Sequence, residues 1–206
     1  MKIFLFIMAA LCGYIVAGVN PAIAFSKAIY HKDIRTCGSG NPGFTNFKRT
    51  FGNRWAWWVL VLDLSKAAAV VGAFSLLLME QGVDYQLAAS YTGIFCMLGH
   101  AFPFQYRFKG GKGFLVCLSI VFVVDWRVGL IATLIMIGLL LVTKYMSLST
   151  VLSMLISPFL LKLFGASWAV FFLIAASVLF MAVRHKENFV RLIRGEESKF
   201  VLKGKE

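Results

Sequence analysis

The chain has 206 residues, of which 60% are hydrophobic and only 15% are charged, whereas soluble domains average roughly 45–50% apolar and 25% charged residues. Apolar runs such as 55–78 also lack the polar face of a helix on a soluble protein, so an ordinary soluble domain is excluded and a membrane protein is indicated. The net charge of +12 suits nucleic acid, an anionic membrane surface or an anionic substrate, and the positions of the cations must decide.

The first predicted helix covers residues 3–26, which is long enough to cross a bilayer because a span needs about 20 apolar residues. Lys2 and the small residues at 22–24 are also typical of a secretory signal peptide. A retained helix is favoured, because the apolar pattern continues through Phe25 and further spans follow it.

The first polar loop, residues 27–54, combines glycines with neutral hydrogen-bonding residues and cations. Glycines allow positive φ and let successive N–H groups approach an anion, so this loop is a candidate phosphate site. An ordinary turn between two helices is the competing interpretation. The candidate residues are Gly38, Ser39, Gly40, Asn41, Gly43, Thr45, Asn46 and Arg49.

The second predicted span, residues 55–79, contains Asp63 and Lys66. Charges inside a span are rare and are usually paired or functional. Their i, i+3 spacing places them on one helix face, and we expect a structural pair that braces the loops.

The next span is expected over residues 86–106, and the loop 107–113 follows it. Three glycines and two lysines in five residues, placed where a helix begins, suit a phosphate at a helix amino terminus. This is not a Walker loop, because Lys112 is followed by glycine rather than Ser or Thr, and a basic turn at the membrane surface is the alternative. The candidates are His100, Lys109, Gly110, Gly111, Lys112 and Gly113.

The region 113–164 is divided by polar residues, and a last span is expected over 166–183. Its short polar loop, 144–149, offers Ser147 as a candidate ligand. We therefore predict an all-α, polytopic transmembrane bundle of seven spans in a single domain, 1–206, with five or six spans as alternatives. The three short apolar pieces lie near 113–124, 128–143 and 149–164.

The tail, residues 184–206, carries His185, Asn188 and Arg191, which share one face if the tail is helical. The same tail resembles an interfacial helix, in which apolar side chains alternate with Lys and Arg. A solvated basic tail that only fixes topology is the alternative, and a lone histidine is more often structural than catalytic.

The cations gather in the loops 27–54, 107–113 and 144–149 and in the tail, whereas Lys2, Arg127 and Lys162 fall on the opposite side. Lys and Arg are enriched in cytoplasmic loops. We therefore expect the amino terminus outside and the carboxyl terminus in the cytoplasm. The four cysteines show no C-x-x-C pair and no histidine cluster, so neither a zinc site nor a disulfide framework is indicated. No cofactor is expected.

In their order and approximate spacing, these segments resemble the bacterial acyl-phosphate:glycerol-3-phosphate acyltransferases of the PlsY type. The resemblance covers nearly the whole chain. It rests on 38–46 with Arg49, on Asp63 and Lys66, on Gly99 to Pro103 with 108–113, on 144–148, and on His185, Asn188, Arg191, Gly195 and Glu196.

The resemblance implies that an acyl chain passes from acyl phosphate to the 1-hydroxyl of sn-glycerol 3-phosphate, giving lysophosphatidic acid and phosphate in phospholipid synthesis. Ser39, Lys109 and His185 would then be catalytic, and the other candidates would bind substrate. The expected partners are the two substrates and membrane lipids, without nucleic acid. The expected location is the inner membrane, with the site facing the cytoplasm, and the oligomeric state is left open, a monomer included.

Three departures from the family pattern concern acyl-chain selectivity and donor identity: Phe114-Leu115-Val116 replaces Val-Ala-Thr, Ala67 replaces a glycine, and Gly18 to Pro21 reads Gly-Val-Asn-Pro. Three other functions compete with this one. They are an organic-phosphate transporter, a non-catalytic lipid-headgroup binder, and a diverged acyltransferase for another phosphorylated polyol.

Overall fold

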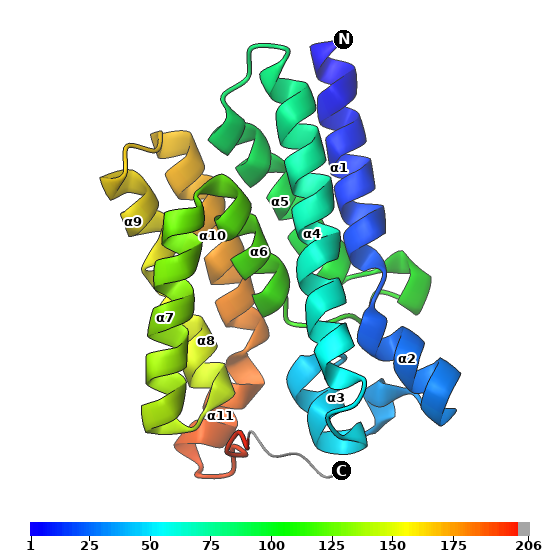
Figure 1. Cartoon of the computed structure of the whole chain (residues 1–206). Coiled ribbons are helices and arrows are strands. Elements are labelled where there is room, and N and C mark those ends of the chain that lie inside the picture. The colour runs from blue at the N-terminus through cyan, green and yellow to red at the C-terminus, as the bar shows by residue number, and fades with distance from the viewer. Residues whose placement is uncertain (202–206) are drawn as a thin grey trace.

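The structure, a computed structural model, describes residues 1–201 and is helical, with no β-strand in that range. The predicted all-α class is thus confirmed (Figure 1). The elements are α1 (Lys2–Gly18), α2 (Pro21–Tyr30), η1 (Ile34–Thr36), α3 (Phe44–Phe51), α4 (Ala56–Met79), α5 (Tyr85–Ala101), η2 (Phe104–Tyr106), α6 (Phe114–Val124), α7 (Trp126–Thr143), α8 (Met146–Leu155), α9 (Ser157–Leu163), α10 (Trp168–Arg184) and α11 (Lys186–Ile193).

The short helix α6 lies between two groups of helices (Figure 1). On one side it contacts α4 and α5, which also pack against α1, and on the other it contacts α7, α8 and α10. Its buried residues Ile120 and Val121 belong to the main core. The packing against α5 is close, because a Cβ at Gly93 would lie 2.6 Å from the Ile120 side chain.

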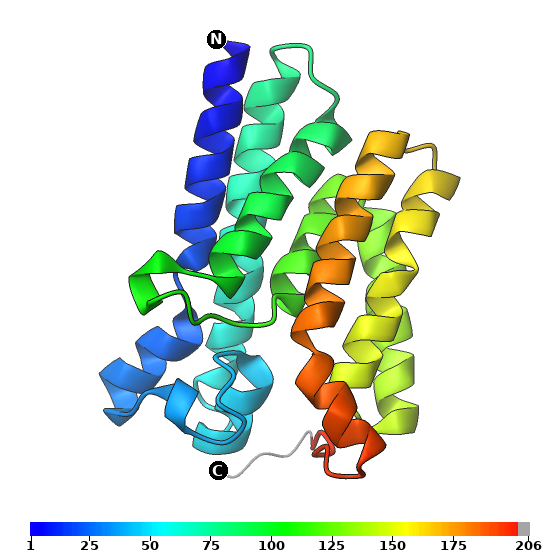
Figure 2. The same ribbon diagram turned by 180° about the vertical axis from the view of Figure 1, so that it is seen from behind.

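The first predicted helix, 3–26, is interrupted, which corrects the expectation of one continuous element. α1 ends at Gly18 and α2 begins at Pro21. Proline lacks the N–H of a helical hydrogen bond and favours the first helical position. The Asn20 side chain accepts a hydrogen bond from the Ile23 N–H at 3.0 Å and caps the new helix. α2 therefore leaves the bundle at an angle to α1 (Figure 2).

Within residues 1–201, five helical segments are long and apolar enough to cross a membrane, or six if the bent pair of α10 and α11 counts as one. α6 has 11 residues and is shorter than a full span. The chain is thus a multi-pass membrane protein, while the count of seven spans stays a prediction.

Large apolar side chains cover the outside of the bundle, as in a protein solvated by lipid. Leu141 is 67% exposed and Phe172 is 63% exposed. Exposed tryptophans lie near both ends, Trp57 and Trp58 at the start of α4 and Trp126 at the start of α7, which is typical of the two interfaces of a membrane.

The amino terminus lies at the opposite end of the bundle from α3 and α11 (Figures 1 and 2). The starts of α6 and α8 lie toward the α3 and α11 end. The polar segments that the sequence singled out therefore meet at one end of the molecule.

Candidate active site

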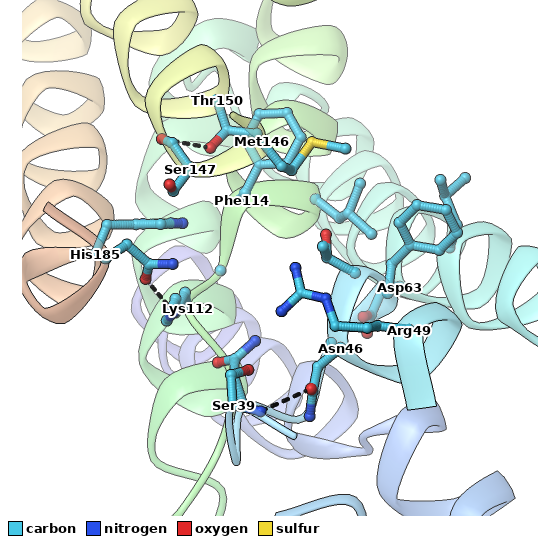
Figure 3. A pocket seen from close by; sticks show the side chains of 18 of the residues that line it. Ser39, Asn46, Arg49, Asp63, Lys112, Phe114, Met146, Ser147, Thr150 and His185 are labelled. Atoms are coloured by element: carbon cyan, nitrogen blue, oxygen red, sulfur yellow. Dashed lines mark hydrogen bonds between the residues drawn. The ribbon is translucent and has the colours of Figure 1, made fainter. Parts of the chain in front are cut away.

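A cavity of about 760 Å³ opens where α3, α6, α8 and α11 approach one another (Figure 3). Four segments that are far apart in the chain line it: the first loop with α3, the start of α6, the turn between α7 and α8, and the tail. Most of the candidate residues from the sequence line this cavity. They are Gly38, Ser39, Asn41, Gly43, Thr45, Asn46, Arg49, His100, Lys112, Gly113, Ser147, His185, Asn188 and Arg191.

Four candidates do not line the cavity: Gly40, Lys109, Gly110 and Gly111. The Lys109 side chain is exposed. The two residues before it, Arg107 and Phe108, both have a left-handed backbone, with φ of 57° and 58°, so the chain turns sharply at the surface before it returns to the cavity. Lys112, which comes after this turn, is the lysine of the loop that reaches the cavity.

Gly110 and Gly111 serve close packing beneath His100. Their N–H groups bond to the carbonyls of Ala101 and His100, at 3.1 Å each, so these groups are committed to the backbone. A Cβ at Gly110 would lie 2.0 Å from the His100 carbonyl oxygen, and one at Gly111 would lie 2.2 Å from the His100 ring. Arg184, which the sequence analysis did not select, donates to the Gly110 and Gly111 carbonyls at 3.3 Å.

Asn46 holds the first loop in shape. Its side-chain oxygen accepts a hydrogen bond from the Ser39 N–H at 3.0 Å, and its amide donates to the Cys37 carbonyl at 3.0 Å. Gly38 has a φ of 56°, and a Cβ there would lie 2.4 Å from the Asn46 side-chain oxygen. The position therefore requires glycine, and Ser39 is presented to the cavity by a braced turn (Figure 3).

Among the helices that begin at the cavity, three have, in the described structure, no side-chain cap and a first or N-cap residue in a polar loop: α3, α6 and α8. Gly43, Gly113 and Met146, at or next to their first residues, line the cavity. The first N–H groups of a helix have no partner within the helix, and its dipole favours an anion there. Side chains cap α2, α5, α7 and α10, namely Asn20, Asp84, Asp125 and Ser167, while α1, α4, α9 and α11 also lack a side-chain cap within residues 1–201.

Glu197 joins the tail to the cationic side of the cavity. Its carboxylate accepts hydrogen bonds from the Ser147 hydroxyl at 2.8 Å, the Asn188 amide at 2.6 Å and Nε of Arg191 at 2.9 Å. Burial would raise the pKa of this carboxyl, but the hydrogen bonds from Asn188, Ser147 and Arg191 outweigh burial, so its pKa is lowered. The resemblance had pointed to the neighbouring Glu196, whose side chain is exposed.

Lys112 bridges the glycine loop and the tail, because its ammonium donates a hydrogen bond to the Asn188 side-chain oxygen (Figure 3). Burial lowers the pKa of Lys112 to about 8, and the positive charge of Arg191 adds to the shift, while Glu197 opposes it. The lysine is therefore mostly charged at neutral pH and would gain stabilisation from a bound anion.

His185 is buried at the bend between α10 and α11. Its Nδ1 lies 2.8 Å from the Met181 carbonyl, which can only accept, so Nδ1 carries a hydrogen. In the neutral ring, Nε2 is then an acceptor. The geometry gives His185 the tautomer that a general base on the Nε2 side requires.

The expected pairing of Asp63 with Lys66 is confirmed, at 2.7 Å between Oδ1 and Nζ. Lys66 Nζ also donates to the Val19 carbonyl at 2.7 Å and lies 3.2 Å from Nδ1 of His100. Asp63 and His100 line the cavity, whereas Lys66 does not. The Lys66 ammonium, which belongs to α4, therefore connects the non-helical residue Val19 after α1 with His100 of α5.

The other half of the cavity is apolar and runs into the bundle between α4, α6 and α7. Phe114, Leu115 and Leu118 of α6 line it. The residues of the other two helices that line it are Leu60, Leu64, Thr133 and Met136. One polar, cationic end thus continues into an apolar channel, which is an arrangement suited to an anionic headgroup bearing an acyl chain.

The chain matches known proteins over nearly its whole length. The family model for glycerol-3-phosphate acyltransferase matches residues 7–195. The glycerol-3-phosphate acyltransferase of Aquifex aeolicus is 37% identical, over 96% of this chain and 98% of the relative. That of Listeria welshimeri is 32% identical, over 94% of this chain and 96% of the relative.

Two similar solved structures are those of PlsY (YgiH), an integral membrane glycerol 3-phosphate acyltransferase. The glycerol 3-phosphate form has a TM-score of 0.86 at 30% identity and covers 97% of this chain and 96% of its own. The lysophosphatidic acid form has a TM-score of 0.79 at the same identity, over 97% of this chain and 95% of its own.

Proposed function

This chain belongs to the glycerol-3-phosphate acyltransferase family, and we propose that it transfers an acyl chain from acyl phosphate to the 1-hydroxyl of sn-glycerol 3-phosphate. The hydroxyl oxygen attacks the acyl carbonyl carbon, and the bond from that carbon to the phosphate oxygen breaks. The hydroxyl proton is taken up as phosphate leaves. The products are lysophosphatidic acid and inorganic phosphate.

The observation that carries this proposal is the convergence of three uncapped helix starts and several cations on one cavity. Both substrates are close to dianions near neutral pH. Two such phosphates about 6 Å apart would repel by roughly 11 kcal/mol at an effective dielectric of 20. Unpaired N–H groups at helix starts, with Lys112, Arg49 and Arg191, are the groups that offset such repulsion.

We assign the two phosphates to opposite sides of the cavity. Ser39, Asn41 and the start of α3 hold the donor phosphate. The residues that hold glycerol 3-phosphate are Arg49, Lys112, Ser147, His185 and Asn188. Lys112 takes the role that the sequence had suggested for Lys109, because Lys109 lies outside the cavity.

The acyl group lies in the apolar channel between α4, α6 and α7, so that its carbonyl is held where the channel meets the polar end. Because acyl phosphate is already activated, no acyl-enzyme is needed, and positioning with charge stabilisation supplies the acceleration. His185 is oriented to accept the hydroxyl proton at Nε2. An oxygen of the departing phosphate is the other group able to accept it.

We propose seven crossing segments, with α6 as a short one, in a single domain of the inner membrane. The amino terminus would be outside and the cavity would face the cytoplasm. The excess of Lys and Arg in the loops at the cavity end supports this orientation, as does the position of the amino terminus at the far end (Figure 1).

The proposal is tested with the protein purified in detergent and supplied with acyl phosphate and glycerol 3-phosphate. We expect phosphate and lysophosphatidic acid to appear in equal amounts and only when both substrates are present. Equal rates with acyl-CoA as the donor would refute the donor assignment. If the protein binds both substrates but forms no product, the proposal that it is an acyltransferase is wrong.

A further inference from the structure

The apolar channel ends one helical turn before an aromatic ring that lies between α6 and α7. α6 runs away from the polar end, and Leu118 is its last residue along the cavity. α7 returns toward the polar end after a single connecting residue, and Thr133 is its first residue along the cavity. Phe122 follows Leu118 by four residues, and Gly129 precedes Thr133 by four, so each lies one turn further on the same face.

Phe122 and Gly129 are in direct contact at this place. A Cβ at Gly129 would lie 2.4 Å from Cγ of the Phe122 ring and within 2.7 Å of both Cδ atoms. The ring therefore lies flat on the glycine, in the space that any other side chain on α7 would fill. Phe122 is 36% exposed, so the ring is not enclosed in the core, and it lies one turn beyond Leu118, the last residue of α6 that lines the cavity.

One hydrogen bond near the ring joins two helices. The Ser119 hydroxyl donates to the Leu64 carbonyl at 2.8 Å, which joins α6 to α4. Within α7, the Thr133 hydroxyl donates to the Gly129 carbonyl at 2.8 Å. The Phe122 ring therefore occupies the space between α6 and α7 one turn beyond the last residues that line the channel.

We propose that Phe122, seated on Gly129, determines the acyl-chain length that this enzyme prefers. The inference rests on the proposed function, because it takes the channel to hold the acyl chain of the donor. The nine residue steps from Gly113 to Phe122 span about 14 Å along the helix. A short acyl chain that starts at the polar end stops before the ring, whereas an extended long chain reaches it and must bend or lose contact.

The test compares acyl phosphates of graded length, from ten to eighteen carbons, by the ratio of kcat/KM for the longest and shortest donors. Removing the ring with Phe122→Ala should raise this ratio about tenfold, the scale on which apolar pockets discriminate chain length. Gly129→Ala adds a methyl group beneath the ring, pushes the ring into the channel, and should lower the ratio. The short-donor kcat/KM serves as the readout of an intact polar site.

Phe172→Ala is the matched control, because Phe172 is 63% exposed on α10, away from the residues that line the cavity, and its removal should leave the ratio unchanged. If Phe122→Ala is not recovered folded, Phe122→Leu shortens the same side chain and should shift the ratio in the same direction. Wild-type ratios in active Phe122 and Gly129 variants would overturn the inference while the function stands. A wild-type protein that uses no acyl phosphate of any length would overturn both.

Discussion

Lys112 donates a hydrogen bond to the side-chain oxygen of Asn188, a residue 76 positions later in the chain. This contact joins the glycine loop to α11 across the polar end of the cavity. It also selects one of two neighbouring lysines, because Lys109 is exposed and does not line the cavity.

Replacing Lys112 by methionine should lower kcat/KM by about 10²–10³, the usual effect of removing a donor that stabilises developing charge. The matched control is Lys109→Met, which removes the same charge three residues away and should stay within a fewfold of wild type. Steady-state rates for both variants decide the assignment. The reverse order of effects would return the catalytic role to Lys109.

The rate should also depend on pH through Lys112. Burial lowers the pKa of this ammonium to about 8, so the positive charge is present below that pH and is lost as the pH rises through it. kcat/KM, which reports groups of the free enzyme, should therefore fall above about pH 8. In Lys112→Arg the guanidinium stays charged, so the fall in kcat/KM at alkaline pH should disappear. If kcat/KM of this variant falls as it does in the wild type, another group is responsible.

The sequence predicted the polar loops and their shared side of the membrane, because the glycine-rich segments and the excess of lysine and arginine recur in loops on one side of the predicted spans. It gave the catalytic role to Lys109 and only a binding role to Lys112. The left-handed turn at Arg107 and Phe108, which leaves Lys109 outside the cavity, was not predicted because such a backbone is uncommon for residues other than glycine. Glu197 was missed for a similar reason, because two adjacent glutamates in a basic tail look alike until the turn after α11 buries one.

The break between α1 and α2 was missed although its signal was present. An asparagine followed by a proline is a typical helix start, but the unbroken apolar run around Asn20 and Pro21 dominated the prediction. The side-chain amide of Asn20 also donates to the Pro42 carbonyl at 3.0 Å, a contact with the first loop that no local pattern could indicate.

Glu197→Gln should destabilise the tail, because Ser147, Asn188 and Arg191 would lose a charged acceptor. A buried donor left without its partner costs about 1–3 kcal/mol, which thermal unfolding in detergent can detect. Glu196→Gln is the control, since that side chain is exposed.

The carboxyl of Glu197 should also make the free energy of unfolding depend on pH in the acidic range. Its folded pKa lies below the ordinary value of 4.5, so its contribution is present above about pH 4.5 and is lost as the pH falls through the folded pKa. In Glu197→Gln this part of the acid dependence should be missing. Equal acid profiles for the variant and the wild type would contradict the role given to this carboxylate.

Lys66→Met should destabilise the bundle by about 3–5 kcal/mol, because it leaves the Asp63 carboxylate buried without its partner. The double variant Asp63→Asn with Lys66→Met should recover part of that loss, as no unpaired charge then remains. The free energies of unfolding of Lys66→Met, Asp63→Asn and the double variant together measure the coupling energy between the two residues. Strictly additive effects would show that the two residues act independently.

We propose that the first loop and the tail form one anion-binding pocket on a single side of the membrane, and cysteine labelling tests this most directly. Thr45→Cys and Ser198→Cys both lie along the cavity, and Glu80→Cys lies in the exposed turn after α4, near the opposite end (Figure 1). After the native cysteines are replaced, each variant is treated with a membrane-impermeant thiol reagent in oriented vesicles. We predict that Thr45→Cys and Ser198→Cys are labelled from the same side, opposite to Glu80→Cys, and are both protected by glycerol 3-phosphate. Labelling of those two positions from opposite sides would contradict the account.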